Sequence, residues 1–180
     1  SPAGRTDFSY NPTTKLLDSV RAPNNIVTTY GYLGSMLASE SISGPAAGRV
    51  DFTYDNSLRI SSVSVNQANP INYGYDNDGL MTSAGALSLT YNLANGALAT
   101  TTLGGMTENY LYNNFGEVTD YTALRNGSPL LDVDYSYDKL SRITQRVELF
   151  NGGSDTYEYE YDSKGRLTNV DKNFSPHSAY

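Results

Sequence analysis

Two groups of acidic residues have the types and spacing that could do chemistry. The first comprises Asp155, Glu158, Glu160 and Asp162, and the second comprises Asp132, Asp134 and Asp138. Paired carboxylates hydrolyse glycosides when they face each other across a sugar at about 5–10 Å. The same residues also fit the solvated face of a β-strand followed by a turn, because polar and apolar side chains alternate along both segments. We therefore predict no catalytic residue in either group.

Two other candidates lack the partners that their chemistry requires. His177 is the only histidine, and the chain has no cysteine to join it in a metal site or a nucleophilic pair. The segment Asp76-Asn77-Asp78-Gly79 is similar to a calcium-binding loop, but alignment on Gly79 places Gly85 where the bidentate glutamate should stand. We predict a turn at this segment and no bound metal or cofactor.

Composition excludes several classes of protein. The net charge is −7, and no lysine or arginine lies between Arg59 and Arg125, so we expect no nucleic-acid-binding surface. No apolar run is long enough to span a membrane. The 16 tyrosines and the many small polar residues are typical of a secreted or cell-surface protein. The chain opens at Ser1 in the middle of a repeated pattern, which favours a segment of a longer array.

The acidic groups described above lie within an internal repeat that runs along the chain. A tyrosine followed by a turn and then an aliphatic residue recurs at intervals of about 22 residues. These anchor tyrosines are Tyr10, Tyr32, Tyr54, Tyr75, Tyr91, Tyr112, Tyr137 and Tyr161. Such a period predicts that each copy is one supersecondary unit stacked on the next.

The last copy shows what each unit should be. Tyr157, Tyr159 and Tyr161 alternate with two glutamates, which predicts a half-buried strand with three rings on one face. Asp162 favours an Asx-type turn, and Gly165 can adopt positive φ without steric cost. Residues 166–170 then form the returning strand, with Leu167 facing the rings. Each copy is therefore predicted to be a β-hairpin.

Turn chemistry also separates one copy from the next. Asn126-Gly127 and Asn151-Gly152 are strong signals for hairpin turns, and we also expect a break at Asn69-Pro70. The expected fold is all-β, a continuous antiparallel meander of roughly 16 strands. Residues 1–172 form the array of about eight repeats, and 173–180 form a tail that contains His177. Strand twist should curl so wide a sheet or wind it into a spiral.

The clearest copies resemble a known family. Tyr161-Asp162-Ser163-Lys164-Gly165-Arg166-Leu167 is similar to the motif of YD repeats, also called RHS repeats. The copy from Tyr137 to Ile143 resembles it too, with Ser141 in the glycine position. Partial copies start at Tyr54, Tyr75 and Tyr112. The resemblance implies a β-ribbon that spirals into a hollow shell, as in bacterial toxins, toxin-complex cocoons, wall-associated proteins and teneurins.

The resemblance and the repeat together predict a non-enzymatic structural module that forms shell wall. The residues expected to carry this role are Tyr54, Tyr75, Tyr112, Tyr137, Tyr161, Asp138, Asp162, Gly79, Gly116 and Gly165. The expected partners are adjoining repeats of a longer chain. Two alternatives stay open at this point: a subunit that assembles into filaments with identical copies through open strand edges, and an adhesin that binds glycans through its tyrosines.

Overall fold

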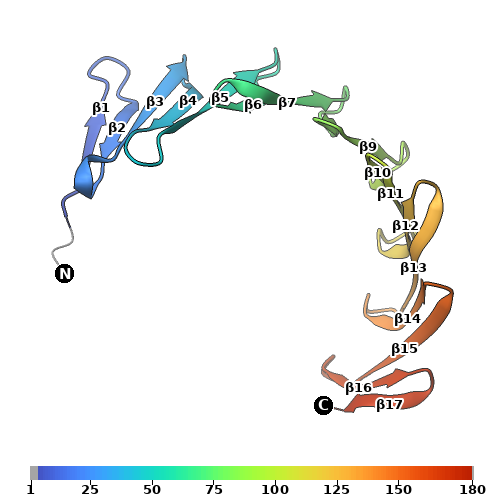
Figure 1. Cartoon of the computed structure of the whole chain (residues 1–180). Coiled ribbons are helices and arrows are strands. Elements are labelled where there is room, and N and C mark those ends of the chain that lie inside the picture. The colour runs from blue at the N-terminus through green and yellow to red at the C-terminus, as the bar shows by residue number, and fades with distance from the viewer. Residues whose placement is uncertain (1–3, 180) are drawn as a thin grey trace. The chain divides into compact units, whose positions relative to one another are not determined.

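The computed structural model describes residues 4–179, and their regular structure is β-strand except for one short 3-10 turn. The chain divides into two units, 1–85 and 86–180, which are described separately. Figure 1 shows the succession of hairpins in each unit. The prediction of an all-β fold is confirmed.

The first unit consists of eight strands, each antiparallel to the next along the chain. They are β1 (Asp7–Tyr10), β2 (Leu17–Arg21), β3 (Val27–Leu33), β4 (Met36–Ile42), β5 (Gly48–Tyr54), β6 (Ile60–Val65), β7 (Ala68–Tyr75) and β8 (Met81–Ala84), with the 3-10 turn η1 (Pro23–Asn25) between β2 and β3.

The second unit continues the same pattern of antiparallel neighbours. Its strands are β9 (Leu87–Tyr91), β10 (Leu98–Leu103), β11 (Met106–Tyr112), β12 (Val118–Arg125), β13 (Ser128–Tyr137), β14 (Ile143–Phe150), β15 (Gly153–Tyr161), β16 (Leu167–Lys172) and β17 (Ser175–Ala179). The predicted antiparallel meander is therefore confirmed within each unit.

The anchor tyrosines mark the ends of strands. Except for Tyr32, which Leu33 follows, each is the last residue of its strand. In β15 the alternation places Tyr159 opposite Val170 and Tyr161 opposite Leu167 of β16. Cross-strand pairs of this kind, an aromatic ring against an aliphatic side chain, are the unit of sheet stabilisation.

Burial is shallow throughout the part of the chain that the structure describes. The buried apolar residues there are Ala123, Val133 and Val170, and no large side chain is fully enclosed. A single layer of sheet leaves both faces accessible, so rings and aliphatic side chains are mostly half-buried. The ladder hydrogen bonds and contacts between neighbouring repeats must therefore supply much of the stability.

The prediction that residues 173–180 form a tail was wrong. Residues 173–180 include β17, which pairs with β16, and the His177 ring lies edge-on to Tyr157 at 6.3 Å between centroids. The connecting turn is Asn173-Phe174, with φ of 48° and 64°. Asn tolerates that conformation but Phe rarely adopts it, so the pair lacks the usual glycine signal.

A second turn was also misplaced. Asn69-Pro70 lies inside β7, and the hairpin turn is Asn66-Gln67, with φ of 52° and 58°. The Asn66 side chain accepts a hydrogen bond from the Arg49 backbone at 2.8 Å, which holds the turn although glycine is absent. The two Asn-Gly turns at 126–127 and 151–152 are confirmed, with positive φ at all four residues.

Candidate functional site

The repeated feature of this molecule is the turn that follows each anchor tyrosine. Asp or Asn follows the anchor tyrosine in seven copies. In five of these, its side-chain oxygen accepts hydrogen bonds from two backbone N–H groups, two and four residues later. The distances lie between 2.8 and 3.1 Å for Asp55, Asp76, Asn113, Asp138 and Asp162. One side-chain oxygen therefore closes each turn, as in an Asx turn.

Every one of these turns contains a residue with a left-handed backbone. Three of them use glycine: Gly79, Gly116 and Gly165 have φ of 88°, 82° and 80°, so the positive φ expected of Gly165 is confirmed. The other two use Leu58 (64°) and Ser141 (60°), which adopt this conformation at a steric cost. The turn geometry therefore persists where the glycine is lost.

Three of the turns add an arginine. The Arg142 guanidinium donates from Nε to Asp138 Oδ2 at 2.7 Å and approaches the same oxygen through a terminal nitrogen at 2.6 Å. The pairs Asp55–Arg59 and Asp162–Arg166 repeat the Nε contact. The Arg142 side chain lowers the pKa of Asp138. The backbone N–H of Arg166 is the main cause of the lowered pKa of Asp162.

Four anchor tyrosines connect their hairpin to the preceding one. Each hydroxyl donates to a backbone carbonyl of the previous copy, at distances of 2.7 to 2.9 Å. The pairs are Tyr54 with Leu37, Tyr75 with Ile60, Tyr137 with Val118, and Tyr161 with Ile143. We call the contact between one turn and the next anchor tyrosine a junction.

Arginine closes two of these junctions. The Arg59 guanidinium lies over the Tyr75 ring at 4.3 Å, and that of Arg142 lies over Tyr161 at 4.6 Å. Such cation–π contacts contribute about 0.5–2 kcal/mol, depending on exposure. Each of these arginines therefore joins its own turn aspartate to the ring of the next repeat.

The arginines were missed as site residues, although Arg166 stands in the quoted motif. The sequence signal was their fixed place four residues after the aspartate.

Of the five tyrosines predicted as site residues, Tyr112 is the one whose hydroxyl is not among these four bonds. It ends β11 and lines a cavity with Asn92 and Ala97.

The structure separates the acidic residues of the first group. Asp155 pairs with Lys172 at 2.9 Å, and Asp162 binds Arg166 in its turn. Glu158 lies opposite Asp171 and Glu160 opposite Asn169, both on the strand face away from Asp155. Two of the four carboxylates in this group are therefore paired with basic side chains.

The second group is only partly assembled. Asp134 lies directly opposite Asp120 across β12 and β13, and Asp132 is close by, whereas Asp138 is held in its turn by Arg142. Burial raises the pKa of Asp132, and the charges of Asp120 and Asp134 raise it further. Asp120 was not foreseen because the register that brings it there joins separate repeats.

A polar cluster on the tyrosine face was also missed. The Glu108 carboxylate accepts hydrogen bonds from Thr101 (2.7 Å), Tyr121 (2.8 Å) and Tyr110 (3.3 Å), which lower its pKa. Burial, followed by the contact with Glu108, raises the pKa of Tyr121 to about 12. The Tyr110 and Tyr121 rings are 5.2 Å apart. These three hydrogen bonds compensate the half-buried Glu108 carboxylate for the water that it loses.

Neither a metal site nor a membrane-spanning helix is found within residues 4–179. No group of three or more metal-ligating side chains gathers there, and no helix is long and apolar enough to cross a bilayer.

Comparison with known proteins places this geometry in context. The model of the family described as Teneurin YD-shell matches residues 1–180. Teneurin-4 of Mus musculus is 26% identical over 96% of this chain, and Teneurin-3 of Danio rerio is 26% identical over 92%. The chain spans only about 7% of the length of these relatives.

Solved structures share the fold. A crystal structure of TcdB2-TccC3-Cdc42 matches 93% of this chain and 13% of its own, with a TM-score of 0.59 and 14% identity. The Tc holotoxin pore of Photorhabdus luminescens matches 94% of this chain and 15% of its own, with a TM-score of 0.51 and 13% identity. The resemblance to RHS and YD repeats is thereby confirmed.

Proposed function

Because this chain belongs to the teneurin YD-shell family, we propose that it is a non-catalytic wall segment of a secreted or cell-surface protein. The observation that carries the proposal is the junction: a tyrosine hydroxyl bonded to the preceding hairpin, repeated at four places. Its role is mechanical, because each junction couples two hairpins that share little buried apolar area.

The coupling can be tested by hydrogen exchange on the chain itself. Tyr161→Phe removes the hydroxyl that donates to Ile143 and should speed local exchange in β14 and β15 about fivefold, the effect of about 1 kcal/mol. Tyr159→Phe is the matched control in the same strand, since the Tyr159 hydroxyl donates no hydrogen bond within residues 4–179. Equal effects of the two substitutions would contradict the coupling.

The wall itself can be tested in the full-length protein. These 180 residues contain no cysteine, so a single introduced cysteine is the only thiol of this segment. Thr119 lines a cavity with two tyrosines, and Ser136 is exposed on the other face of its strand. If one face is enclosed, Thr119→Cys should react with a small maleimide and resist a polymer-linked one, and Ser136→Cys should react with both. Equal reactivity of both cysteines with the polymer would contradict enclosure.

Self-assembly through strand edges is the second candidate. Strand β17 pairs with β16, with a register shift between Val170 and Asp171. A strand that lacks a partner on one side offers the backbone groups of that side to another chain. Light scattering over a range of concentrations tests this directly. Growth of mass with concentration would support assembly, and a constant monomer mass would remove it.

Glycan binding is the third candidate, and it would use exposed rings such as Phe174, which is 77% exposed. The hydroxyls of Tyr54, Tyr75, Tyr137 and Tyr161 already donate to backbone carbonyls, so they have no hydrogen left to donate to a sugar. A glycan array probed with the folded chain and with Phe174→Ser tests the idea. Absence of binding, or binding unaffected by the substitution, would argue against this site.

A further inference from the structure

Within the described residues, two of the four junctions, those of Tyr54 and Tyr137, have no arginine stacked on the ring, and the junction of Tyr137 has a glutamate in the arginine position. In the turn between β11 and β12, Asn113 replaces the aspartate and Glu117 replaces the arginine. The Asn113 amide donates to Glu117 Oε2, so the pair keeps its mutual contact with the roles of donor and acceptor exchanged. The ring of the next anchor, Tyr137, consequently has no guanidinium over it, unlike Tyr75 and Tyr161.

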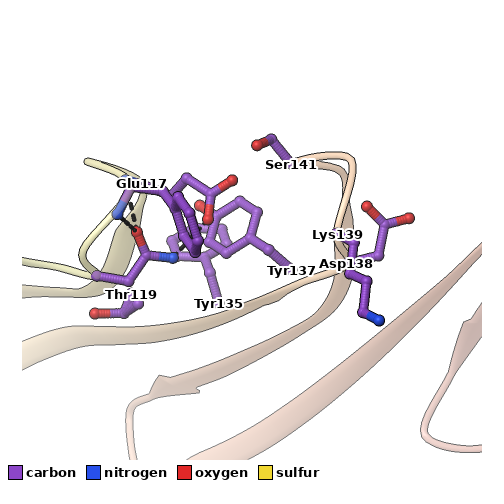
Figure 2. Close-up of a pocket in the computed structure, with 9 residues that line it drawn as sticks. Glu117, Thr119, Tyr135, Tyr137, Asp138, Lys139 and Ser141 are labelled. Carbon is purple, nitrogen blue, oxygen red and sulfur yellow. Dashed lines mark hydrogen bonds between the residues drawn. The ribbon is translucent and has the colours of Figure 1, made fainter.

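A cavity of about 370 Å³ opens where the guanidinium would lie. Its walls include Glu117, Thr119, Tyr135 and Tyr137. Figure 2 shows the Glu117 carboxylate on the same side as the two tyrosine rings, and the Lys139 side chain pointing away from it. The two rings are tilted and 6.5 Å apart. The lining also includes Lys139 and Asp138, and Arg142 already binds the Asp138 carboxylate. The space is therefore bounded by aromatic rings and by the Glu117 carboxylate, which no arginine of the described chain binds.

Among the residues described, the Glu117 carboxylate has no cationic partner, unlike Asp138 in the same lining. Within residues 4–179, no arginine or lysine forms an ion pair with Glu117, and Oε1 receives no hydrogen bond. The Glu117 charge still reaches the neighbouring ring: after burial, it is the next cause that raises the pKa of Tyr137. An acceptor and an aromatic face are thus presented together, and no internal group uses both.

We propose that this cavity binds the guanidinium group of an arginine side chain from another polypeptide. The molecule supplies the template twice, where Arg59 and Arg142 each contact a turn carboxylate and stack on the next tyrosine. Here the ring remains and a carboxylate, Glu117, stands in the arginine position, so the cation must come from outside the turn. Arginine suits the site better than lysine because its planar fork bonds a carboxylate while its face stacks on a ring.

The neighbouring junction provides a matched comparison. A cavity also opens beside Tyr112, where Ala97 stands at the position that other turns give to arginine. Its lining residues include asparagines and Phe115, but no carboxylate. This cavity therefore offers space beside a tyrosine without a carboxylate, and we expect the arginine to select the cavity that contains Glu117.

The direct test is a titration followed by NMR of the tyrosine ring signals. The probe is an acetylated, amidated Gly-Arg-Gly peptide, with the corresponding citrulline peptide as its neutral control. The arginine peptide should shift the Tyr137 signals with a millimolar Kd, and citrulline should bind at least tenfold more weakly. Tyr112 should not respond. Equal shifts with both peptides, or no shift at Tyr137, would overturn the proposal.

Two variants sharpen the result. Glu117→Gln should remove arginine binding while leaving the turn intact, because the Asn113 side chain still closes it. The double variant Asn113→Asp with Glu117→Arg rebuilds the closed junction, so it should lose binding of the peptide and melt at a higher temperature. Unchanged binding by Glu117→Gln, or by the double variant if it folds, would refute the assignment. Free guanidinium ion binding as tightly as the peptide would refute a polypeptide source.

Discussion

Two neighbouring junctions of the second unit differ in one pair of side chains. At the first, Asn113 and Glu117 stand beside Tyr137, and a cavity lies between them and the ring. At the second, Asp138 and Arg142 stand beside Tyr161, and the guanidinium covers the ring. Figure 1 shows that the two turns occupy equivalent places in successive hairpins.

The comparison shows that different groups stabilise the turn and fill the space over the next tyrosine ring. Both turns receive the same two backbone N–H bonds on a side-chain oxygen, and both tyrosine hydroxyls donate to the preceding hairpin. An amide oxygen serves the turn as well as a carboxylate does. Only the residue four positions later decides whether the space over the next ring is filled or open.

The largest expected effect comes from removing the ring at each junction. Tyr161→Ala should lower the free energy of unfolding by about 3 kcal/mol, and Tyr137→Ala by about 2 kcal/mol. The difference of about 1 kcal/mol is the contribution of the stacked arginine, which Tyr161 has and Tyr137 lacks. Urea unfolding of both variants measures it. Equal losses would mean that the guanidinium contributes no stability at the closed junction.

The next effect concerns the left-handed residue in each turn. Gly165→Val and Gly116→Val should each destabilise by about 1–3 kcal/mol, because a β-branched side chain opposes positive φ. A β-carbon at Gly116 would have no atom within 4 Å, so any loss there is backbone strain and not a clash. Thermal melting checks both variants. An unchanged midpoint for Gly116→Val would contradict the strain argument.

The reverse substitution should stabilise the closed junction. Ser141 holds φ at 60° with a β-carbon, so Ser141→Gly relieves strain and should add about 0.5–1 kcal/mol, after the entropy that glycine gains in the unfolded chain is subtracted. Ser136→Gly, in an extended strand, is the control and should destabilise slightly. A loss of stability with Ser141→Gly would show that the serine makes a compensating contact.

The smallest expected effect is a response to acid at the closed junction. The pKa of Asp138 is lowered in the folded state, chiefly by Arg142, so its stabilising contribution is present above its usual pKa of about 3.9. That contribution is lost as the pH falls through the folded-state value. Asp138→Asn copies Asn113 and should lose less stability between pH 5 and about 3. Identical acid profiles of the variant and the parent chain would contradict this.

Much of the fold could be predicted because the repeat is local. Alternation around Tyr159 and the Asx-type turn at Asp162 depend only on neighbours in sequence, and both are present in the structure. The same reasoning failed at Phe174 and Gln67, which take positive φ in hairpin turns. At these two residues the pairing of both flanking strands imposes positive φ. The conformational preferences of single residues do not predict this.

The candidate site was less accessible from sequence for a similar reason. The anchor tyrosines and turn glycines follow from the period. The partner of each tyrosine hydroxyl, such as Ile143 for Tyr161, lies one repeat away and is a backbone carbonyl without a side-chain signature. The cluster around Glu108 likewise joins three strands through Thr101 and Tyr121.

The amino-acid sequence alone determined the hairpins, their period and their family, because these depend on the alternation of side chains and on turn residues close together in the chain. Only the tertiary structure decided which junctions are filled. Whether Arg142 covers Tyr161, and whether Glu117 is left with an open cavity beside Tyr137, depends on register between hairpins about 20 residues apart. That register determines which charged side chain lies beside each tyrosine ring.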